Sequence, residues 1–249
     1  QIEQDIHFLA TAARDLPTRH RSITAVFDHS WRLLNPAEQR TLSQLALFQG
    51  GFTRAAAQAV AGASLVTLSA LVTKSLVRMA DGRYDLHELV RQFAVAQLTD
   101  DDLLRATQRR HAEYYLDLLR QREAALQRAT QLQVIDELQR ELGNVRQAWT
   151  WAGRFALWEL LFHATHCYWA FHDAQGLVHE GSAATELLIQ QLTDQAATPE
   201  SVRTLGRLLC YCGFFYFRQG DNGAAHAYME RSIGLLRPLN DPTLLIDPL

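Results

Sequence analysis

His87 has the clearest setting for chemistry in this chain of 249 residues. It follows the extended run 83–86 and precedes a helical pattern that continues to about Leu98. A histidine at such a junction lies among the free N–H groups and the positive dipole end of the helix, which favour an anion. The same dipole disfavours a second ring proton, so we expect a neutral N–H donor. The alternative is that His87 only caps the helix or packs against it.

A second group of residues has the spacing of metal ligands on one helix: His163, His166, Cys167 and His172. Such spacing can present two or three ligands on one face. The helix also carries bulky aromatic residues, namely Tyr168, Trp169 and Phe171. Histidines on a partly buried helix more often pack than bind metal, so we predict no metal site. Cys210 and Cys212 fall on opposite sides of a helix and are predicted to pack as well.

Composition excludes several classes of protein. The net charge is −3, so no global basic field attracts nucleic acid or acidic membrane. The chain has three cysteines without regular spacing, which favours a reducing, cytoplasmic compartment over a disulfide framework. No apolar run approaches the roughly 20 residues that span a bilayer, and the polar start at Gln1 is not a signal peptide. The missing initiator Met suggests a piece of a longer protein.

The first part of the chain predicts a winged-helix domain over residues 1–99. Helices are expected at 2–13, 22–34 (with Ser22 as N-cap), 36–48, 54–61, 64–74 and 87–98. Asn35, Pro36 and Glu38 have the order of a capping box, and Gly50-Gly51 should end the helix that they begin. Two extended runs flank Asp81-Gly82, which predicts a β-hairpin.

The rest of the chain predicts helices joined by short connections, as in a stacked solenoid. They are expected at 103–128, 134–152, 155–171, 177–192, 202–219 and 223–236. The last pair has the spacing of a tetratricopeptide unit, carried by Gly213, Tyr216, Gly220 and Ala225. We therefore predict an all-α fold with one small β-hairpin wing. Residues 100–197 form a helical linker of degenerate repeats, and residues 198–249 form a truncated tetratricopeptide-like repeat.

Two basic features are expected to carry no special chemistry. The predicted helix 64–74, which would read DNA in a winged helix, has Lys74 as its cation. Major-groove readers need more polar and basic side chains, so we expect no nucleic-acid binding through this module. The cluster Arg109-Arg110-His111 is expected to be a solvated helix face. The tryptophans and phenylalanines of the arm are expected mainly in packing.

Long runs of the chain resemble bacterial STAND-class signalling NTPases. The runs are Ser22 to Arg40, Leu45 to Thr53 and Leu71 to Val77, and the segment Tyr84 to Ala94 resembles the Met-His-Asp signature of their winged helix. Here that signature reads Leu86-His87-Glu88. The resemblance implies that His87 contacts the β-phosphate of ADP in the whole protein. Leucine replaces methionine as a packing equivalent, and glutamate keeps the charge of aspartate and its possible capping role.

The resemblance also implies what lies outside the chain. No Gly-x-x-x-x-Gly-Lys-Ser/Thr loop occurs in these residues, so we expect no ATP hydrolysis by this piece and no cofactor bound to it. ADP or ATP with Mg²⁺ would bind an upstream nucleotide-binding domain of the same protein, the expected partner of the winged helix. The helical repeats would bind an inducer or a partner protein.

The sequence therefore predicts a regulatory and sensor piece of a STAND ATPase, in which the winged helix locks the ADP-bound off state. Two alternatives stay open. The first is a DNA-binding transcription regulator whose winged helix reads an operator. The second is a passive scaffold in which the repeats bind protein and the winged helix has no switch role.

Overall fold

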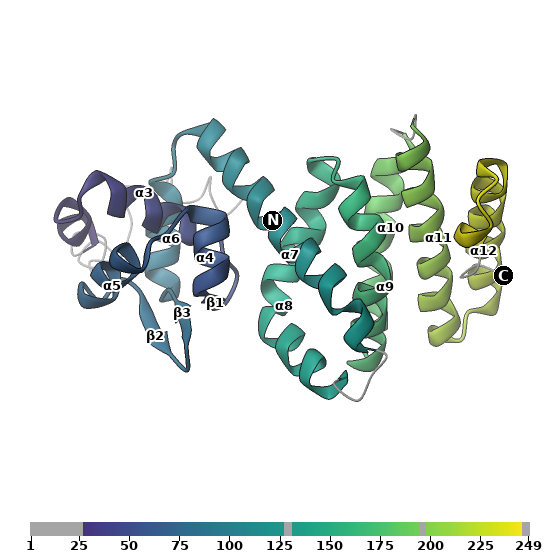
Figure 1. Ribbon diagram of the computed structural model, residues 1–249, viewed down its shortest axis with the longest axis horizontal. Helices are drawn as coiled ribbons and strands as arrows, with labels where there is room; N and C mark the ends of the chain where they lie inside the picture. The colour runs from purple at the N-terminus through teal and green to yellow at the C-terminus, as the bar shows by residue number, and fades with distance from the viewer. Residues whose placement is uncertain (1–26, 127–130, 195–197, 246–249) are drawn as a thin grey trace, which may run out of the picture.

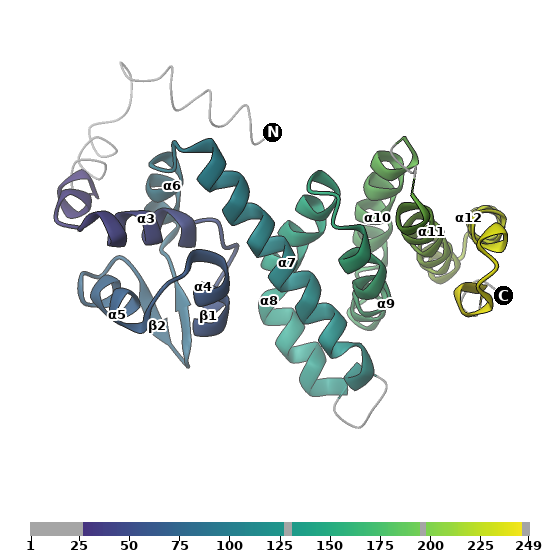
Figure 2. The ribbon, with the colours of Figure 1, turned by 45° about the horizontal axis from the view of Figure 1, so that its top comes forward.

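The computed structural model describes residues 27–126, 131–194 and 198–245. The expected helix at 2–13 and its neighbour's cap at Ser22 lie outside these residues, while residues 27–32 of that neighbour are helical. The molecule is elongated, with a small helical unit and its sheet at one end (Figure 1). Helix α7 runs out of that unit, and the later helices stand side by side towards the other end (Figure 2).

The helices of the first unit begin at their predicted caps. The expected end of the 36–48 helix at Gly50-Gly51 was wrong: α3 ends at Leu45, because Leu47 and Phe48 form tighter turns, with hydrogen bonds to the carbonyls of Gln44 and Leu45. Helix α3 spans Pro36–Leu45, with Asn35 and Glu38 forming both hydrogen bonds of the capping box at 2.9 Å. Helix α4 spans Arg54–Ala61 and has Thr53 as its N-cap. Helix α5 spans Leu65–Thr73 behind the Ser64 cap, and α6 spans Glu88–Ala96. The expected helices at 54–61, 64–74 and 87–98 are thus confirmed, and Leu65 of α5 is about half exposed.

The hairpin is confirmed and has a third strand that was not expected. Strands β2 (Arg78–Ala80) and β3 (Arg83–Asp85) pair in antiparallel fashion around Asp81-Gly82. Both turn residues have positive φ, 51° and 74°, which an Asp-Gly pair adopts at little cost. Strand β1 (Phe52–Thr53) pairs with β3 on its other side, giving the order β1-β3-β2. Two residues are too few to show an alternating pattern.

The remaining helices form the expected arm. They are α7 (Asp101–Leu126), α8 (Gln131–Arg154), α9 (Trp158–Ala174), α10 (Val178–Thr193), α11 (Pro199–Gln219) and α12 (Asn222–Leu236). Helix α9 packs between α7 and α11. The even-numbered helices α8, α10 and α12 pack against these three from the side. The fold is all-α with one small β wing, followed by a helical solenoid.

The tetratricopeptide-like pair is built as its spacing predicts. A Cβ on Gly213 would lie 3.1 Å from the carbonyl oxygen of Ala225, so α11 and α12 approach closely. Gly220 ends α11 with φ of 84°. Tyr216 stacks on Tyr228 at 5.4 Å between ring centroids. Both hydroxyls donate to Glu186 of α10, which ties the pair to the preceding helix.

One buried core runs through both parts of the molecule. It extends without a break from Leu34 to Phe215. Trp149 of α8 and Tyr168 of α9 stack at 3.7 Å in the arm, whereas Phe217 is 61% exposed. The core continues across residues 99 and 197, so it does not mark a boundary at either position. The domain boundaries at 99 and 197 stay predictions. In the described residues no single helix has the length and apolar composition of a membrane span; α4 and α5 meet that test only together, with a bend of 109° between them.

Candidate functional site

His87 lies at the surface, at the point where β3 leads into α6. It is the N-cap residue of α6, and its side chain is exposed. Nδ1 accepts a hydrogen bond of 3.3 Å from the backbone N–H of Leu89. Nδ1 must be unprotonated to accept, so the ring proton of the neutral form is on Nε2. Within the described ranges Nε2 has no hydrogen-bond partner, so it is available to donate outward.

The backbone beneath His87 is held by a buried arginine. Arg91 donates Nη1 to the carbonyl oxygen of Phe48 and Nη2 to Asp85 Oδ1 at 3.1 Å and to the Leu86 carbonyl at 3.3 Å. These contacts join α6, the end of β3 and the segment that follows α3. A planar guanidinium with several donors suits this task better than a lysine. Arg91 therefore stabilises the position of the residues that come directly before His87.

The two neighbours of His87 behave differently from one another. Leu86 is buried, in agreement with a packing role in place of methionine. Glu88 is exposed; it pairs with Arg91 Nε at 3.3 Å and accepts from Gln92 at 2.9 Å. The backbone cap of α6 comes from the His87 side chain rather than from Glu88. A carboxylate in the first turn still suits the positive end of the helix.

The helix that would read DNA exposes apolar and hydroxyl side chains and has no basic residue within its bounds. Val66 of α5 is 80% exposed, and Leu65 beside it is about half exposed. Lys74 is paired with Glu38 at 2.6 Å, and this hydrogen bond lowers the pKa of the Glu38 carboxyl, helped by the N–H of Asn35. The adjacent groove has a volume of about 810 Å³ and contains Arg78, which pairs with Asp85 at 3.5 Å. These cations are therefore partly neutralised within the protein.

The residues considered as metal ligands have separate partners. His163 Nε2 lies 3.0 Å from Glu159, and His166 Nδ1 lies 2.9 Å from Glu123. His172 is buried with Nδ1 2.8 Å from the carbonyl oxygen of Tyr168. In the described part of the chain, no three His, Cys, Asp or Glu residues are grouped as a metal would require. Cys167, Cys210 and Cys212 are all buried.

A polar joint between the winged helix and the arm was not anticipated from the sequence. Asn144 of α8 accepts from the N–H of Gln49 at 2.8 Å and donates to the Gly51 carbonyl at 3.1 Å. Glu141 pairs with Arg83 of β3 at 2.5 Å, and Arg83 also donates to Gly51 at 2.8 Å. Glu141 and Asn144 are both buried. The joint thus connects α8 to the turn before β1 and to the wing.

One sequence signal could have revealed this joint. Gly143 lies in the interior of α8 between Glu141 and Asn144, where glycine destabilises a helix. A Cβ at Gly143 would lie 2.5 Å from the carbonyl oxygen of Gln49. An isolated glycine within a helical pattern usually has a packing reason. Here that reason is the contact between α8 and the backbone at Gln49.

The expectation of a solvated face at Arg109-Arg110-His111 was wrong for two of the three residues. His111 is fully buried, where its ring packs 5.2 Å from Phe48 and 5.0 Å from Trp151. Burial lowers the pKa of His111 to about 3, so the ring is neutral. Arg110 is half-buried and donates Nε to the Val60 carbonyl at 2.8 Å. Arg109 remains exposed beside Glu113. The local triplet gave no sign that α4 covers this side of α7.

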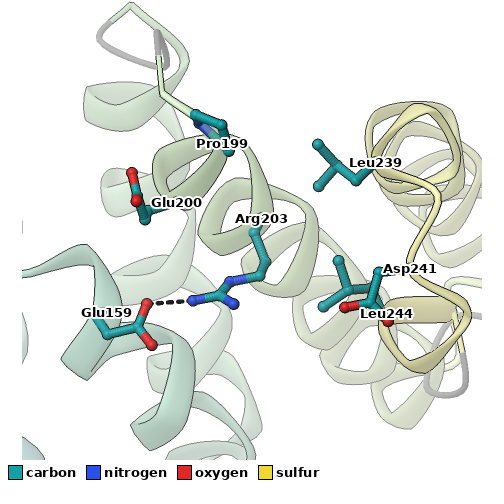
Figure 3. A pocket seen from close by; sticks show the side chains of 7 residues that line it. All are labelled: Glu159, Pro199, Glu200, Arg203, Leu239, Asp241 and Leu244. Carbon is teal, nitrogen blue, oxygen red and sulfur yellow. Dashed lines mark hydrogen bonds and ion pairs between the residues drawn. The ribbon is translucent and has the colours of Figure 1, made fainter.

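A shallow pocket of about 640 Å³ lies at the far end of the arm (Figure 3). Arg203 of α11 crosses it and pairs with Glu159 of α9. Glu200 and Asp241 add two further carboxylates to the lining, and apolar walls come from Pro199, Leu239 and Leu244. Asp241 accepts from the N–H and hydroxyl of Thr243, which lowers its pKa. The pocket is therefore acidic, and its guanidinium is already paired.

No family model matches the chain. Two mycobacterial proteins, Mb0914c from Mycobacterium bovis and Rv0890c from Mycobacterium tuberculosis, are 32% identical to it over 162 residues, and both are provisionally named HTH-type transcriptional regulators. The match covers 61% of this chain but only 18% of each relative. A STAND protein with a tetratricopeptide-repeat sensor, PH0952 from Pyrococcus horikoshii, aligns with 95% of this chain and 36% of its own, at 16% identity and a TM-score of 0.43. This TM-score is too low to establish a shared fold. The chain is thus similar in sequence to a small part of much longer mycobacterial proteins.

Proposed function

We propose that this chain is the regulatory and sensor part of a STAND signalling ATPase. In this proposal the winged helix holds the nucleotide-binding domain of the same protein in its ADP-bound off state. His87 donates Nε2–H to the β-phosphate, and the helical arm receives an inducer or partner protein. An inducer activates only if it binds the open state better than the closed state.

The observation that carries this proposal is the setting of His87. Its ring is exposed and oriented by the hydrogen bond from Leu89 to Nδ1, which leaves Nε2 free to donate. Arg91 of α6 contacts the side chain of Asp85 and the carbonyl of Leu86, just before the junction. A donor that is already oriented loses little conformational freedom when it binds a phosphate oxygen. The order Leu86-His87-Glu88 and the long sequence resemblance support the same role.

The joint between α8 and the wing supports a path from the arm to His87. Arg83 lies on β3, and its guanidinium contacts Glu141 of α8. The same strand ends at Asp85, which Arg91 contacts on the other side. A displacement of α8 would therefore act on the strand that leads to His87.

The test uses the protein that contains both the nucleotide-binding domain and this chain. His87→Asn removes the imidazole but keeps a preferred N-cap residue, so α6 should still form. We expect faster ADP dissociation, by about tenfold for the loss of one hydrogen bond to a charged group, and raised basal output. His226→Asn is the matched control, because His226 is an exposed histidine on α12. Unchanged ADP release in His87→Asn would refute the switch role and favour the passive scaffold.

Direct DNA binding is a second candidate, since the mycobacterial relatives are provisionally named HTH-type transcriptional regulators. Their names apply to proteins of which this chain matches a small part. The lack of a basic side chain within α5 and the pairing of Lys74 with Glu38 disfavour α5 as the reading helix. Sequence-dependent gel shifts by this chain at physiological salt would support the candidate.

A further inference from the structure

A second, cationic pocket lies where the winged helix meets the arm. Its volume is about 330 Å³, and α3, α4 and α7 all contribute to it. The lining residues are Arg40, Gln44, Gln58, Ala59, Ala61, Gly62 and Arg110. Two guanidinium groups and two amides thus line a space whose walls are otherwise small residues. Ligand pockets are common at such junctions between structural units.

The side chains that line this pocket carry a net positive charge. Among the described residues that line it there is no carboxylate. In the part of the chain that the structure describes, neither Arg40 nor Arg110 forms an ion pair with Asp or Glu. The sequence between Glu38 and Asp81 contains no acidic residue but four basic ones: Arg40, Arg54, Lys74 and Arg78. Two cations that share a pocket repel each other, and a bound anion would relieve that repulsion.

Arg110 is held in place before any ligand binds. Its Nε donates to the Val60 carbonyl at 2.8 Å, and Nη2 donates to Thr107 Oγ1 at 3.2 Å. With the Gln44 amide oriented so that its oxygen faces α7, that oxygen accepts from Nη2 at 3.0 Å and its nitrogen donates to the Arg40 carbonyl at 3.3 Å. These bonds use Nε and Nη2, so Nη1 remains for a ligand.

The C-terminal end of α4 lies at the same pocket, and its carbonyl groups carry partial negative charge that would oppose the binding of an anion. That end is largely satisfied within the protein. The N–H of Gly62 donates to the Gln58 carbonyl at 3.0 Å, and the N–H of Ala63 donates to the Ala57 carbonyl at 3.2 Å. Arg110 donates to Val60 in the same turn. Two full positive charges therefore outweigh the partial charges of the helix end.

We propose that this pocket binds a small oxyanion, namely a phosphate group, between Arg40 and Arg110. Arginine guanidinium groups match the geometry of phosphate oxygens and form charge-assisted hydrogen bonds to them. The anion would join α3 and α4 to α7, and so would strengthen the contact between the winged helix and the arm. The site is separate from His87, so it does not depend on the nucleotide switch.

The test is an NMR titration of the ¹⁵N-labelled chain with inorganic phosphate at constant ionic strength, with sodium chloride as the reference. We expect saturable shifts of the Gly62 amide and of the Arg110 side-chain N–H, with a Kd on the order of 0.1–10 mM for so small a ligand. Arg40→Ala should raise that Kd about tenfold or more, because one charged partner is lost. Arg105→Ala is the control. Arg105 is exposed on α7, the helix that carries Arg110, and its replacement removes one positive charge, as Arg40→Ala does.

Two further arms identify the source of the phosphate group. Propyl phosphate should shift the same resonances if the site accepts an ester, whereas binding of inorganic phosphate alone would restrict the proposal to the free ion. Shifts that are linear and equal in phosphate and chloride would overturn the proposal. Equal Kd values for Arg40→Ala and Arg105→Ala would overturn it too, as would shifts caused by a DNA duplex but not by inorganic phosphate.

Discussion

Gly143 on α8 lies directly against the backbone of Gln49, which belongs to the loop between α3 and β1. A Cβ atom at Gly143 would lie 2.5 Å from the Gln49 carbonyl oxygen and 3.1 Å from its carbonyl carbon. Backbone atoms cannot rotate away as a flexible side chain can. The approach of the arm to the winged helix therefore requires a residue without a side chain at this position.

Gly143→Ala should destabilise the protein although alanine favours helices. We expect a loss of about 1–3 kcal/mol in the free energy of unfolding, the usual effect of overpacking. Chemical denaturation followed by circular dichroism measures it. Gly234→Ala is the matched control, because Gly234 lies in α12 with open space around its Cβ position. There the substitution should stabilise by about 0.5–1 kcal/mol. Equal effects at the two positions would contradict the close contact.

Asn144→Asp tests the hydrogen bonds of the joint at nearly constant volume. The new carboxylate could still accept from Gln49, but it could not donate to Gly51 and would face the carboxylate of Glu141. We expect a loss of about 2–4 kcal/mol at neutral pH, mainly from the repulsion between two buried carboxylates, since the Gly51 carbonyl keeps its hydrogen bond from Arg83.

The loss from Asn144→Asp should shrink in acid. Two adjacent carboxylates raise the pKa of the pair in the folded protein, so a proton is taken up as the pH falls and can be shared between them. Denaturation curves at several pH values measure this recovery. Asn222→Asp, at an exposed position in the first turn of α12, is the control and should cost little. A deficit that is independent of pH would argue against contact between the two carboxylates.

The sequence predicted the elements better than the contacts between them, for a physical reason. Caps such as Asn35 and turns such as Asp81-Gly82 act within a few residues, so local spacing is enough to locate them. The joint instead unites Gln49 and Gly51 with Asn144, far apart in the chain, and no local pattern encodes that pairing. His87 could be located because its role as N-cap is local; its proposed contact with a nucleotide involves another domain and stays a prediction.

His111 should make the protein less stable in mild acid. Its pKa is lowered by burial from 6.5 to about 3, so in the folded state it stays neutral while the unfolded chain takes up a proton below about 6.5. The free energy of unfolding therefore falls as the pH drops from 6.5 towards 3, by up to about 1.4 kcal/mol per pH unit. Burial also lowers the pKa of His172, which adds to the same trend.

His111→Gln separates the contribution of His111 to this pH dependence from that of His172. Glutamine does not titrate, so the slope of stability between pH 6.5 and 4.5 should decrease by up to about 1.4 kcal/mol per pH unit. Carboxyl groups with lowered pKa, such as Glu38 and Glu180, lose their stabilisation mainly below 4.5 and so contribute little in this window. His226→Gln, at an exposed site, should leave the slope unchanged. A slope equal to that of the unmodified chain in His111→Gln would show that His111 is not buried in neutral form.

Arg91→Lys should loosen the support of His87 while the positive charge is kept. Lysine has one ammonium group and cannot reach the Phe48 carbonyl, Asp85 and Glu88 together as the guanidinium does. We expect a loss of about 1–3 kcal/mol in stability from carbonyl groups left without donors. Hydrogen exchange of the Leu89 amide should also accelerate more than that of amides in α12, because its partner His87 is less well positioned. Arg105→Lys, on the exposed face of α7, is the control. Slow exchange at Leu89 in both variants would show that His87 is held without Arg91, and the proposed donor would then depend on the α6 cap alone.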